Sequence, residues 1–431
     1  MTARTVVRPQ LTAELPDDAE TVISYGMGVD SSACITELIL NPERRSWRLD
    51  KLTVLIAIVG ATDEYRDIRH QVENYVFPLL ADAGVRTVQV ARNGPRAADG
   101  YSVLSDTRAP KRLVPERATW ALSTKMLEAG TVPQVNPKKR TCSEHAKHWA
   151  LKRWIRDNIK GRHRHILGFS SEEQDRIDLD LGFATDQRHP VHPLADWQWT
   201  REVSQIYLET VYGERFVRSC CSFCPFQYNT NNLLTLAQRW TDEPEAGATA
   251  LEMEYVAVRL NEKAYLFGDK SALKFARDHH LDGALSALNA RLEESAWAVY
   301  DVGRVLHADT NNPAARGHTW RSVTTLQRGG RRQMEGALHG WARQCRAPIE
   351  YDANGFERVA LSRRGEGYPA TERYLVAGPA RAIDKRRAKY YEAWDAVHPL
   401  VGIDLGDVAR YPQRRIEAAE APEGRRLCQI S

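Results

Sequence analysis

The sequence has no long hydrophobic run. Its longest nearly unbroken apolar stretch, from Leu52 to Ala61, is ten residues long and contains a glycine, so it is too short to cross a bilayer. The first 18 residues contain prolines and carboxylates and lack the apolar core that a secretory signal requires. We therefore expect a cytoplasmic protein with no membrane partner.

Cysteines are few, the charge imbalance is small, and there is no internal repeat. The chain has seven cysteines in 431 residues, which without a secretory signal do not indicate a disulfide framework. Its 60 Lys and Arg stand against 56 Asp and Glu, a net charge of +4 that by itself implies no nucleic-acid partner. With 42% hydrophobic and 27% charged residues, the sequence is typical of a globular protein of two or three domains.

Basic residues do gather locally. Between Lys138 and Arg164 there are ten Lys or Arg against two acids, and Trp149 and Trp154 lie among them. Cations interleaved with aromatic rings are typical of a surface that binds a polyanion such as a nucleic acid. The same pattern is also found on a solvated helix face, and the sequence leaves both interpretations open.

The first half of the chain alternates between strand-like and helix-like segments. The strand-like runs are Thr21–Ser24, Leu52–Val59, Val85–Val90 and His165–Phe169, and the helix-like segments between them are Ser31–Leu40, Ile68–Ala83 and Glu144–Ile159. This alternation predicts an α/β fold with a doubly wound, mostly parallel sheet. Ligands of such sheets bind at the carboxyl ends of the strands.

After about residue 229 the strand-like runs of the sequence stop. Four helix-like segments follow, and the region from about Asp301 onward is rich in Gly, Arg and Pro, with one more basic helix expected over Ile383–Val397. We therefore expect an N-terminal tail (1–19), an α/β domain (20–230), a helical extension (231–300) and an arginine-rich C-terminal region of unknown role (301–431). A mainly helical C-terminal extension is thus expected to follow the α/β domain.

The first predicted strand and helix are joined by Ser24-Tyr-Gly-Met-Gly-Val-Asp-Ser-Ser32. Glycines let the backbone turn tightly and approach an anion closely, and the N–H groups of a first helical turn attract phosphate. Hydroxyls add donors, and Asp30 could cap the helix or hold Mg²⁺. The alternative is an ordinary strand-to-helix turn. The candidate phosphate-binding residues are Ser24, Gly26, Gly28, Asp30, Ser31 and Ser32.

This segment resembles the signature of PP-loop ATP pyrophosphatases, usually written S-G-G-x-D-S, and in particular the sulfonucleotide (phosphoadenylyl-sulfate) reductase-like branch of that superfamily. Four further stretches look like that branch in the same order: Leu52–Glu64, Arg140–Lys147, Leu167–Arg176 and His192–Arg201. The likeness covers roughly residues 20 to 230, about half of the chain. It implies a Rossmann-like sheet of the adenine nucleotide alpha hydrolase type.

The sequence departs from the family pattern in two places. Gly26 stands where the family usually has serine, and Met27 stands where it usually has glycine. The C-terminal Glu-Cys-Gly-x-His, which carries the nucleophilic thiol of the true reductases, is absent, and Cys428 lies in Arg-Arg-Leu-Cys-Gln-Ile instead. Reduction of a sulfonucleotide by that thiol is therefore disfavoured.

Three cysteines fall within five residues in Cys220-Cys-Ser-Phe-Cys-Pro225. A C-x-x-C followed by proline is typical of iron–sulfur ligation, whereas four thiolates suit zinc equally well, and free or redox-active thiols are a third alternative. The resemblance implies Cys142 as a further ligand. The predicted set for a [4Fe–4S] cluster, or for zinc, is Cys142, Cys220, Cys221 and Cys224.

The resemblance also singles out four charged residues. Asp63 and Glu64 follow the second strand, where adenosine or a metal would lie, although a solvated loop is the alternative. Lys147 and Arg176 would stabilise charge on departing pyrophosphate, or be ordinary surface salt-bridge partners. Six histidines show no metal-ligand spacing and are interpreted as structural or anion-contacting: His145, His148, His163, His165, His189 and His192.

The function expected from these features is adenylation. The protein would bind ATP–Mg²⁺, with Asp30, Lys147 and Arg176 as catalytic residues, transfer AMP to an oxygen of its substrate and release pyrophosphate. By analogy with DNA phosphorothioation and tRNA thiolation members of the superfamily, sulfur from a donor protein such as a cysteine desulfurase would then enter a nucleic acid or nucleotide. The alternatives are a small-molecule sulfonucleotide reductase with a different thiol, and a non-catalytic nucleotide-sensing or nucleic-acid-binding subunit.

Overall fold

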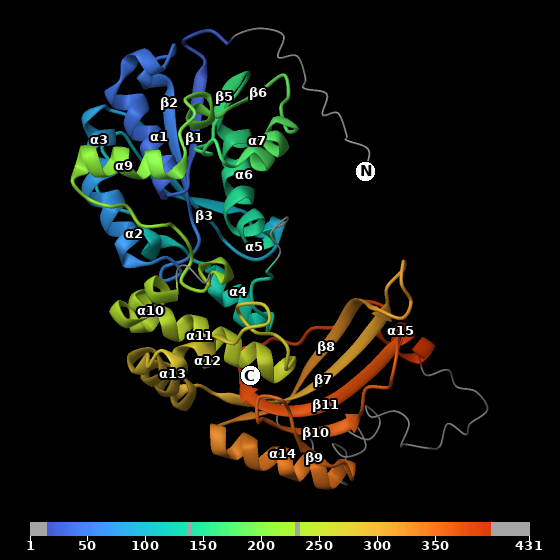
Figure 1. Cartoon of the computed structure of the whole chain (residues 1–431). Helices are drawn as coiled ribbons and strands as arrows, with labels where there is room; N and C mark the ends of the chain where they lie inside the picture. The colour runs from blue at the N-terminus through green and yellow to red at the C-terminus, as the bar shows by residue number, and fades with distance from the viewer. Residues whose placement is uncertain (1–14, 136–139, 229–232, 398–431) are drawn as a thin grey trace. The chain divides into compact units, whose positions relative to one another are not determined.

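The computed structural model describes residues 15–135, 140–228 and 233–397 (Figure 1). The chain divides into two compact units. One holds the residues up to 125 together with 133–236, and the other holds 126–132 and the residues from 237 onward. Our expected boundaries lie near residues 230 and 300. Parts of the predicted N-terminal tail and C-terminal region, Lys138 of the basic stretch, and Cys428 lie outside the described residues.

The first unit is built on a six-stranded sheet with the order β4-β3-β2-β1-β5-β6. Its strands are β1 (Glu20–Tyr25), β2 (Leu52–Ile58), β3 (Arg86–Arg92), β4 (Tyr101–Thr107), β5 (His163–Ile166) and β6 (Arg188–Val191). All neighbours pair in parallel except β3 and β4. The prediction of an α/β fold with a mostly parallel sheet is confirmed.

The strand order places a switch point at β1. The chain first moves from β1 to β2 and β3 on one side and later returns to β5 and β6 on the other. Loops that leave adjacent strands in opposite directions open a crevice at the carboxyl end of the sheet. The segment after β1, which includes the predicted phosphate-binding loop, starts at this point.

Three of the helical segments of the first unit were predicted, and they begin and end within about two residues of the predicted positions; the other helices were not predicted. The helices of this unit are α1 (Val29–Leu40), α2 (Arg66–Gln71), α3 (Phe77–Asp82), α4 (Leu122–Glu128), α5 (Thr141–Ser143), α6 (Trp149–Asn158), α7 (Gln174–Leu181), α8 (Pro193–Asp196) and α9 (Arg201–Tyr212). The helix expected over 68–83 is interrupted by a π-helical turn at Val72–Val76, and a second such turn, Glu144–His148, precedes α6.

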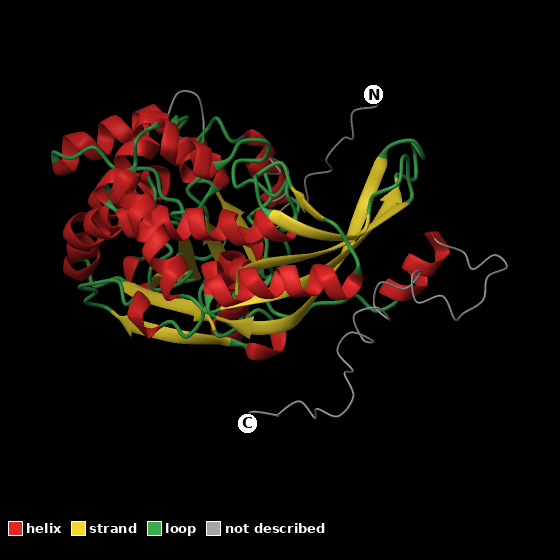
Figure 2. Cartoon of the chain, turned by 90° about the horizontal axis from the view of Figure 1, so that it is seen from below, coloured by secondary structure: helices red, strands yellow, loops and turns green. Residues whose placement is uncertain are grey.

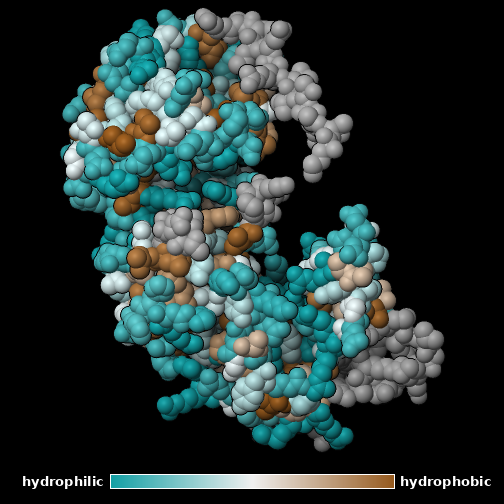
Figure 3. Space-filling model, viewed as in Figure 1, coloured by the Kyte–Doolittle hydropathy of each residue, from teal (hydrophilic) through white to brown (hydrophobic). Residues whose placement is uncertain are grey.

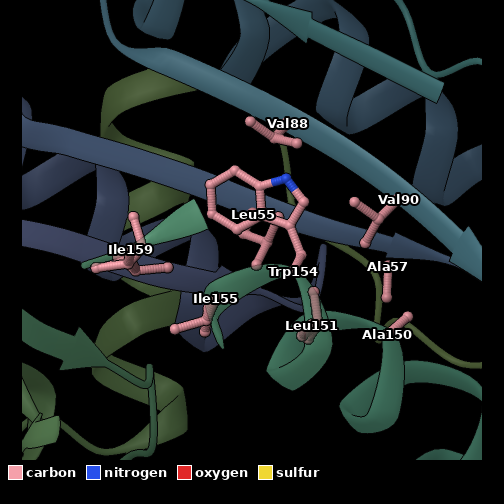
Figure 4. Packing of buried hydrophobic residues seen from close by; sticks show 10 residues of the cluster. Leu55, Ala57, Val88, Val90, Ala150, Leu151, Trp154, Ile155 and Ile159 are labelled. Carbon is pink, nitrogen blue, oxygen red and sulfur yellow. The ribbon is translucent and has the colours of Figure 1, made fainter. Parts of the chain in front are cut away.

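Helix α6 covers one face of the sheet and forms its core there (Figure 4). Trp154, which is 1% exposed, packs with Leu55 of β2 and Val88 of β3, and Trp149 is partly buried against the same cluster. Trp154 is therefore buried in the core and cannot stack on bases, whereas Trp149 keeps part of its surface accessible.

The second unit contains a five-stranded antiparallel sheet in the order β8-β7-β11-β10-β9. Its strands are β7 (Trp297–Ala308), β8 (Arg316–Gly329), β9 (Ile349–Tyr351), β10 (Glu357–Ser362) and β11 (Ala370–Pro379). Its helices are α10 (Leu233–Asp242), α11 (Pro244–Leu260), α12 (Ala272–Asp278), α13 (Asp282–Glu294), α14 (Arg331–Cys345) and α15 (Tyr390–Val397). Figure 2 shows these strands in yellow and the helices in red.

The prediction of a mainly helical C-terminal extension is therefore wrong. The four helices expected between 232 and 299 exist, but the last ends at Glu294 and a long strand follows. The strands of this sheet were not predicted because buried ion pairs place charged residues at core positions. Arg373 of β11 pairs with Asp301 of β7, and Arg304 pairs with Glu372 at 2.6 Å. Charged residues at core positions break the alternation by which strands are recognised.

The longest of the described helices, α11, has 17 residues. Within the described ranges, no helix is long and apolar enough to cross a membrane.

Candidate functional site

The loop between β1 and α1 contains one residue with a left-handed backbone. Met27 has φ +59°, in the left-handed region, where a side chain costs about 1 kcal/mol and glycine costs almost nothing. This is the position at which the resemblance expects glycine. The Met27 side chain is 1% exposed. The substitution thus changes the side chain but keeps the turn.

The start of α1 offers main-chain donors. Gly28 is the N-cap, its N–H donates to Ser31 Oγ at 3.3 Å, and the Ser31 hydroxyl donates to the Gly28 carbonyl at 3.2 Å. Ser32 Oγ lies 2.9 Å from the buried Tyr25 hydroxyl. The N–H groups of the first helical turn have no intrahelical acceptor and lie at the positive end of the helix dipole. The geometry suits an anion held mainly by the backbone.

Two other segments approach this loop closely. A Cβ on Gly28 would lie 2.7 Å from Ser219 Oγ, and a Cβ on Gly168 would lie 2.7 Å from Ser31 Cα. The loop after β5 and the segment that leads into Cys220 therefore both press against the start of α1. This contact brings three stretches together that the sequence predicts as functional.

Asp30 is held by an arginine that the sequence analysis did not select. Its Oδ2 accepts hydrogen bonds from Arg201 Nε at 3.0 Å and Nη2 at 2.6 Å. Its Oδ1 is buried without a hydrogen-bond partner among the described residues. Burial raises the pKa of Asp30, and Arg201 opposes this. Oδ1 is thus left to accept a hydrogen bond from a water bound to magnesium, or to bind a cation directly.

A buried polar network ends at Ser24. His165 Nε2 lies 2.8 Å from Ser24 Oγ, and Arg188 Nε donates to His165 Nδ1 at 2.8 Å. Asp180 accepts from Arg188 at 2.6 Å and lies 3.0 Å from His192 Nε2. None of these four partners was predicted as a site residue, because strands and helices far apart in sequence contribute them.

The network fixes which atom of Ser24 is available. An arginine N–H only donates, so His165 Nδ1 must accept. Burial, followed by the charge of Arg188, lowers the pKa of His165 to about 3, so the ring is neutral and carries its proton on Nε2. That proton is donated to Ser24 Oγ. The hydrogen of the serine hydroxyl is therefore left to donate to a further acceptor, such as a phosphate oxygen.

Asp63 caps a helix. It is fully buried, and its Oδ2 accepts from the Ser123 N–H at 2.9 Å, at the start of α4. Burial raises its pKa from 3.8 to about 6, and the bonds from Ser123 oppose the rise. The predicted role in binding adenosine or a metal stays a prediction, and the structure gives the carboxylate a capping role.

The raised pKa of Asp63 predicts how stability depends on pH. Between pH 3.8 and about 6 the folded chain binds more protons at this group than the unfolded chain does, so the free energy of unfolding should fall as pH rises through this window. The loss attributed to Asp63 is on the order of 2–3 kcal/mol. Asp63→Asn, whose amide oxygen can still accept from Ser123, should remove it in urea titrations between about pH 4 and 7. An unchanged pH slope in the variant would contradict this assignment.

Glu64 and Lys147 form an ion pair beside the cysteine segment. Lys147 Nζ lies 2.7 Å from Glu64 Oε1, and both side chains are largely buried. Glu64 also forms a backbone bridge with Cys221, and the Ser222 N–H donates to the Asp63 carbonyl at 2.8 Å. Burial opposes the charge of Lys147, but Glu64 and the thiols of Cys221 and Cys220 outweigh it and raise its pKa. Lys147 is a fixed cation.

Arg176 lies on α7, at the end of the loop that follows β5. It pairs with Glu173 and lies over the Phe169 ring at 4.1 Å, and Phe169 stacks on His192 at 5.6 Å. The guanidinium is half-exposed, and its charge favours the ionised form of Asp30. It is thus within electrostatic reach of the start of α1.

The predicted cysteine ligands lie in one neighbourhood without forming a metal site. Burial raises the pKa of Cys224, and the nearby Cys142 raises it further. Burial likewise raises the pKa of Cys221, with Cys224 among the groups that act on it. Among the described residues, however, no three His, Cys, Asp or Glu side chains are arranged to hold a metal ion. The [4Fe–4S] or zinc site predicted at these cysteines therefore stays a prediction, and we derive no step through either.

A small hollow lies at the carboxyl end of β2. Its lining includes Ile58, Gly60, Glu64, Tyr65 and Leu113. Glu64 and Arg69 line it together with apolar side chains, and its volume of about 10 Å³ has room for about one water molecule.

Comparison with known proteins gives no relative: no family model, no curated protein and no solved structure matches this chain.

Proposed function

We propose that the protein is an ATP pyrophosphatase that adenylates an oxygen of its substrate. ATP–Mg²⁺ binds where β1 passes into α1, and the bond between the α and β phosphates is cleaved, so that AMP is transferred and pyrophosphate leaves. The observation that carries the proposal is the start of α1: a left-handed Met27, main-chain donors at the helix terminus, and a buried Asp30 oxygen without a partner.

The surrounding residues have complementary roles in this reaction. The backbone N–H groups of the first turn and the Ser24 hydroxyl hold phosphate oxygens. Asp30, fixed by Arg201, orients the magnesium ion or its water. Lys147 and Arg176 stabilise the negative charge that develops on pyrophosphate.

Sulfur transfer to a nucleic acid or nucleotide is the second step of the proposal. It is supported by the resemblance to the reductase-like branch, whose doubly wound alpha hydrolase fold we also propose for the first unit, and by the position of the Cys220–Cys224 segment against Gly28 through Ser219. Sulfur would come from a donor such as a cysteine desulfurase. Whether iron or zinc joins the cysteines is checked by metal and sulfide analysis of the purified protein.

Product analysis tests the proposal. ATP labelled with ³²P at the α position, incubated with the protein, Mg²⁺ and nucleic acid, should yield pyrophosphate and labelled AMP joined to the nucleic acid, which becomes free AMP when sulfur or water displaces it, and Asp30→Asn should abolish this. ADP and phosphate would contradict the proposed cleavage. Binding without turnover, even with a cysteine desulfurase present, would favour a nucleotide-sensing subunit. Sulfite release from adenylyl sulfate with thioredoxin would favour a reductase.

The network that ends at Ser24 predicts non-additive variants. Ser24→Ala removes one hydrogen bond to phosphate and should raise the KM for ATP about five- to tenfold. His165→Ala should have a similar effect because the hydroxyl is no longer oriented. The double variant should be no worse than Ser24→Ala alone, since both changes remove the same interaction. Losses that add would show that His165 acts independently of Ser24.

A further inference from the structure

The edge strand β8 carries a row of cations in the second unit. Lys385 pairs with Val323 through two backbone hydrogen bonds of 2.8 and 2.9 Å, which fixes the segment 385–389 alongside this strand. We define the β8 cationic surface as Arg316, His318, Lys385, Arg386, Arg387 and Lys389, all of which are exposed. Figure 3 shows that the visible face of the second unit is mostly hydrophilic.

The cations of this surface have no anionic partners among the residues that the structure describes. The arginines on the neighbouring strands β7, β10 and β11 are paired with carboxylates: Arg304 with Glu372, Arg358 with Asp352 and Arg373 with Asp301. In contrast, no carboxylate lies within ion-pair distance of Arg316, Lys385, Arg386, Arg387 or Lys389 among the described side chains. The nearby Asp384 accepts from the Thr325 N–H at 2.8 Å, and Glu392 and Asp395 are exposed on α15.

The cations also crowd one another. Burial lowers the pKa of Lys385, and the charges of Arg321 and Arg387 lower it further. Like charges at such spacing repel, and an anion that bound among them would remove this repulsion. The surface is therefore arranged for an anionic partner from outside the described chain.

Aromatic rings lie among these cations. His318 stacks on His307 with ring centroids 4.2 Å apart and planes 17° apart, and Trp320 packs against both rings. Arg387 lies 5.3 Å over Trp320, and Arg386 lies 4.6 Å over the exposed Tyr391. Exposed rings beside cations are the features with which proteins hold unpaired bases and their phosphates.

We propose that the β8 cationic surface binds single-stranded nucleic acid. Phosphates contact Arg316 and the cations of 385–389. Unpaired bases stack on the exposed rings of His318 and Tyr391. An acidic protein would need the cations but not the stacked rings, and in the basic stretch before Arg164 one of the two tryptophans, Trp154, is buried. This surface does not depend on ATP chemistry, so the inference goes beyond the proposed function.

The test is salt-dependent binding of a labelled single strand of about 20 nucleotides, measured by fluorescence anisotropy with the full-length protein and no ATP. Substitution of Arg386, Arg387 and Lys389 by glutamine should weaken binding at least about tenfold and reduce the salt slope by about 2, because each lost phosphate contact removes about 0.7. His318→Ala should weaken binding about tenfold with the slope unchanged.

A matched control removes three cations from α6 instead. Substitution of Lys152, Arg153 and Arg156 by glutamine changes the net charge equally, and binding should stay within about twofold of the parent. Thermal melting checks that all variants fold. The proposal would be overturned if both triple variants lost binding equally or if the β8 variant lost none. It would also be overturned if His318→Ala bound like the parent. Tighter binding of duplex than of the single strand would do so as well.

Discussion

Gly28→Ala should abolish ATP binding. Phosphate oxygens can approach the start of α1 only where the backbone is bare, and a Cβ at this position would lie 2.7 Å from Ser219 Oγ. The side chain would fill the approach and push the neighbouring segment away. We expect an affinity at least about 100-fold weaker by isothermal titration, a loss comparable to removing several backbone contacts to the phosphates, and no measurable AMP formation.

The control separates crowding from ligand binding. Ser219→Gly removes the hydroxyl that the new methyl group would meet, so the double variant Gly28→Ala, Ser219→Gly should recover the melting temperature of the parent. It should still fail to bind ATP. If the double variant bound ATP as the parent does, Gly28 would serve only to make room for Ser219.

Lys147→Met should have the second large effect. The ammonium is a largely buried cation beside the cysteine segment, and in the proposed reaction the loss of such a charge beside a developing anion lowers kcat by about 100- to 1,000-fold. It also leaves Glu64 without its partner at 2.7 Å, which should lower the free energy of unfolding by about 2 kcal/mol, less than for a fully buried pair. Rapid-quench assays of AMP formation and urea titrations measure the two effects.

The variant Lys147→Met, Glu64→Gln distinguishes structure from chemistry. A neutral glutamine needs no cation, so the double variant should regain most of the lost stability and remain inactive. Recovery of activity together with stability would mean that Lys147 acts only by neutralising Glu64.

The central strands could be predicted because their sequences carry the signal directly. β2 is buried along its whole length, and a strand buried on both faces reads as an unbroken apolar run. β4 and β6, which lie at the two edges of the sheet, were not predicted. β4 has mixed exposure along its seven residues, and β6 has only four residues, including His189 and Pro190. Neither sequence leaves a clear alternation to detect.

The candidate site was predicted only where its residues adjoin in sequence. The phosphate-binding role of the loop from Ser24 to Ser32 could be predicted because its glycines and hydroxyl residues gather between a strand and a helix. The partner of Asp30, in contrast, is Arg201, 171 positions away, and Arg188 reaches His165 only because β5 and β6 are neighbours. Such pairings depend on the fold and leave no local pattern.

A crystal structure with a non-hydrolysable ATP analogue and Mg²⁺ tests the central claim most directly. We predict the triphosphate against the backbone of Gly26–Gly28 and the first turn of α1, with a magnesium ion or its water at Asp30 Oδ1 and a phosphate oxygen at the Ser24 hydroxyl. A structure in which the analogue binds elsewhere, with this turn empty at saturating concentration, would contradict the account.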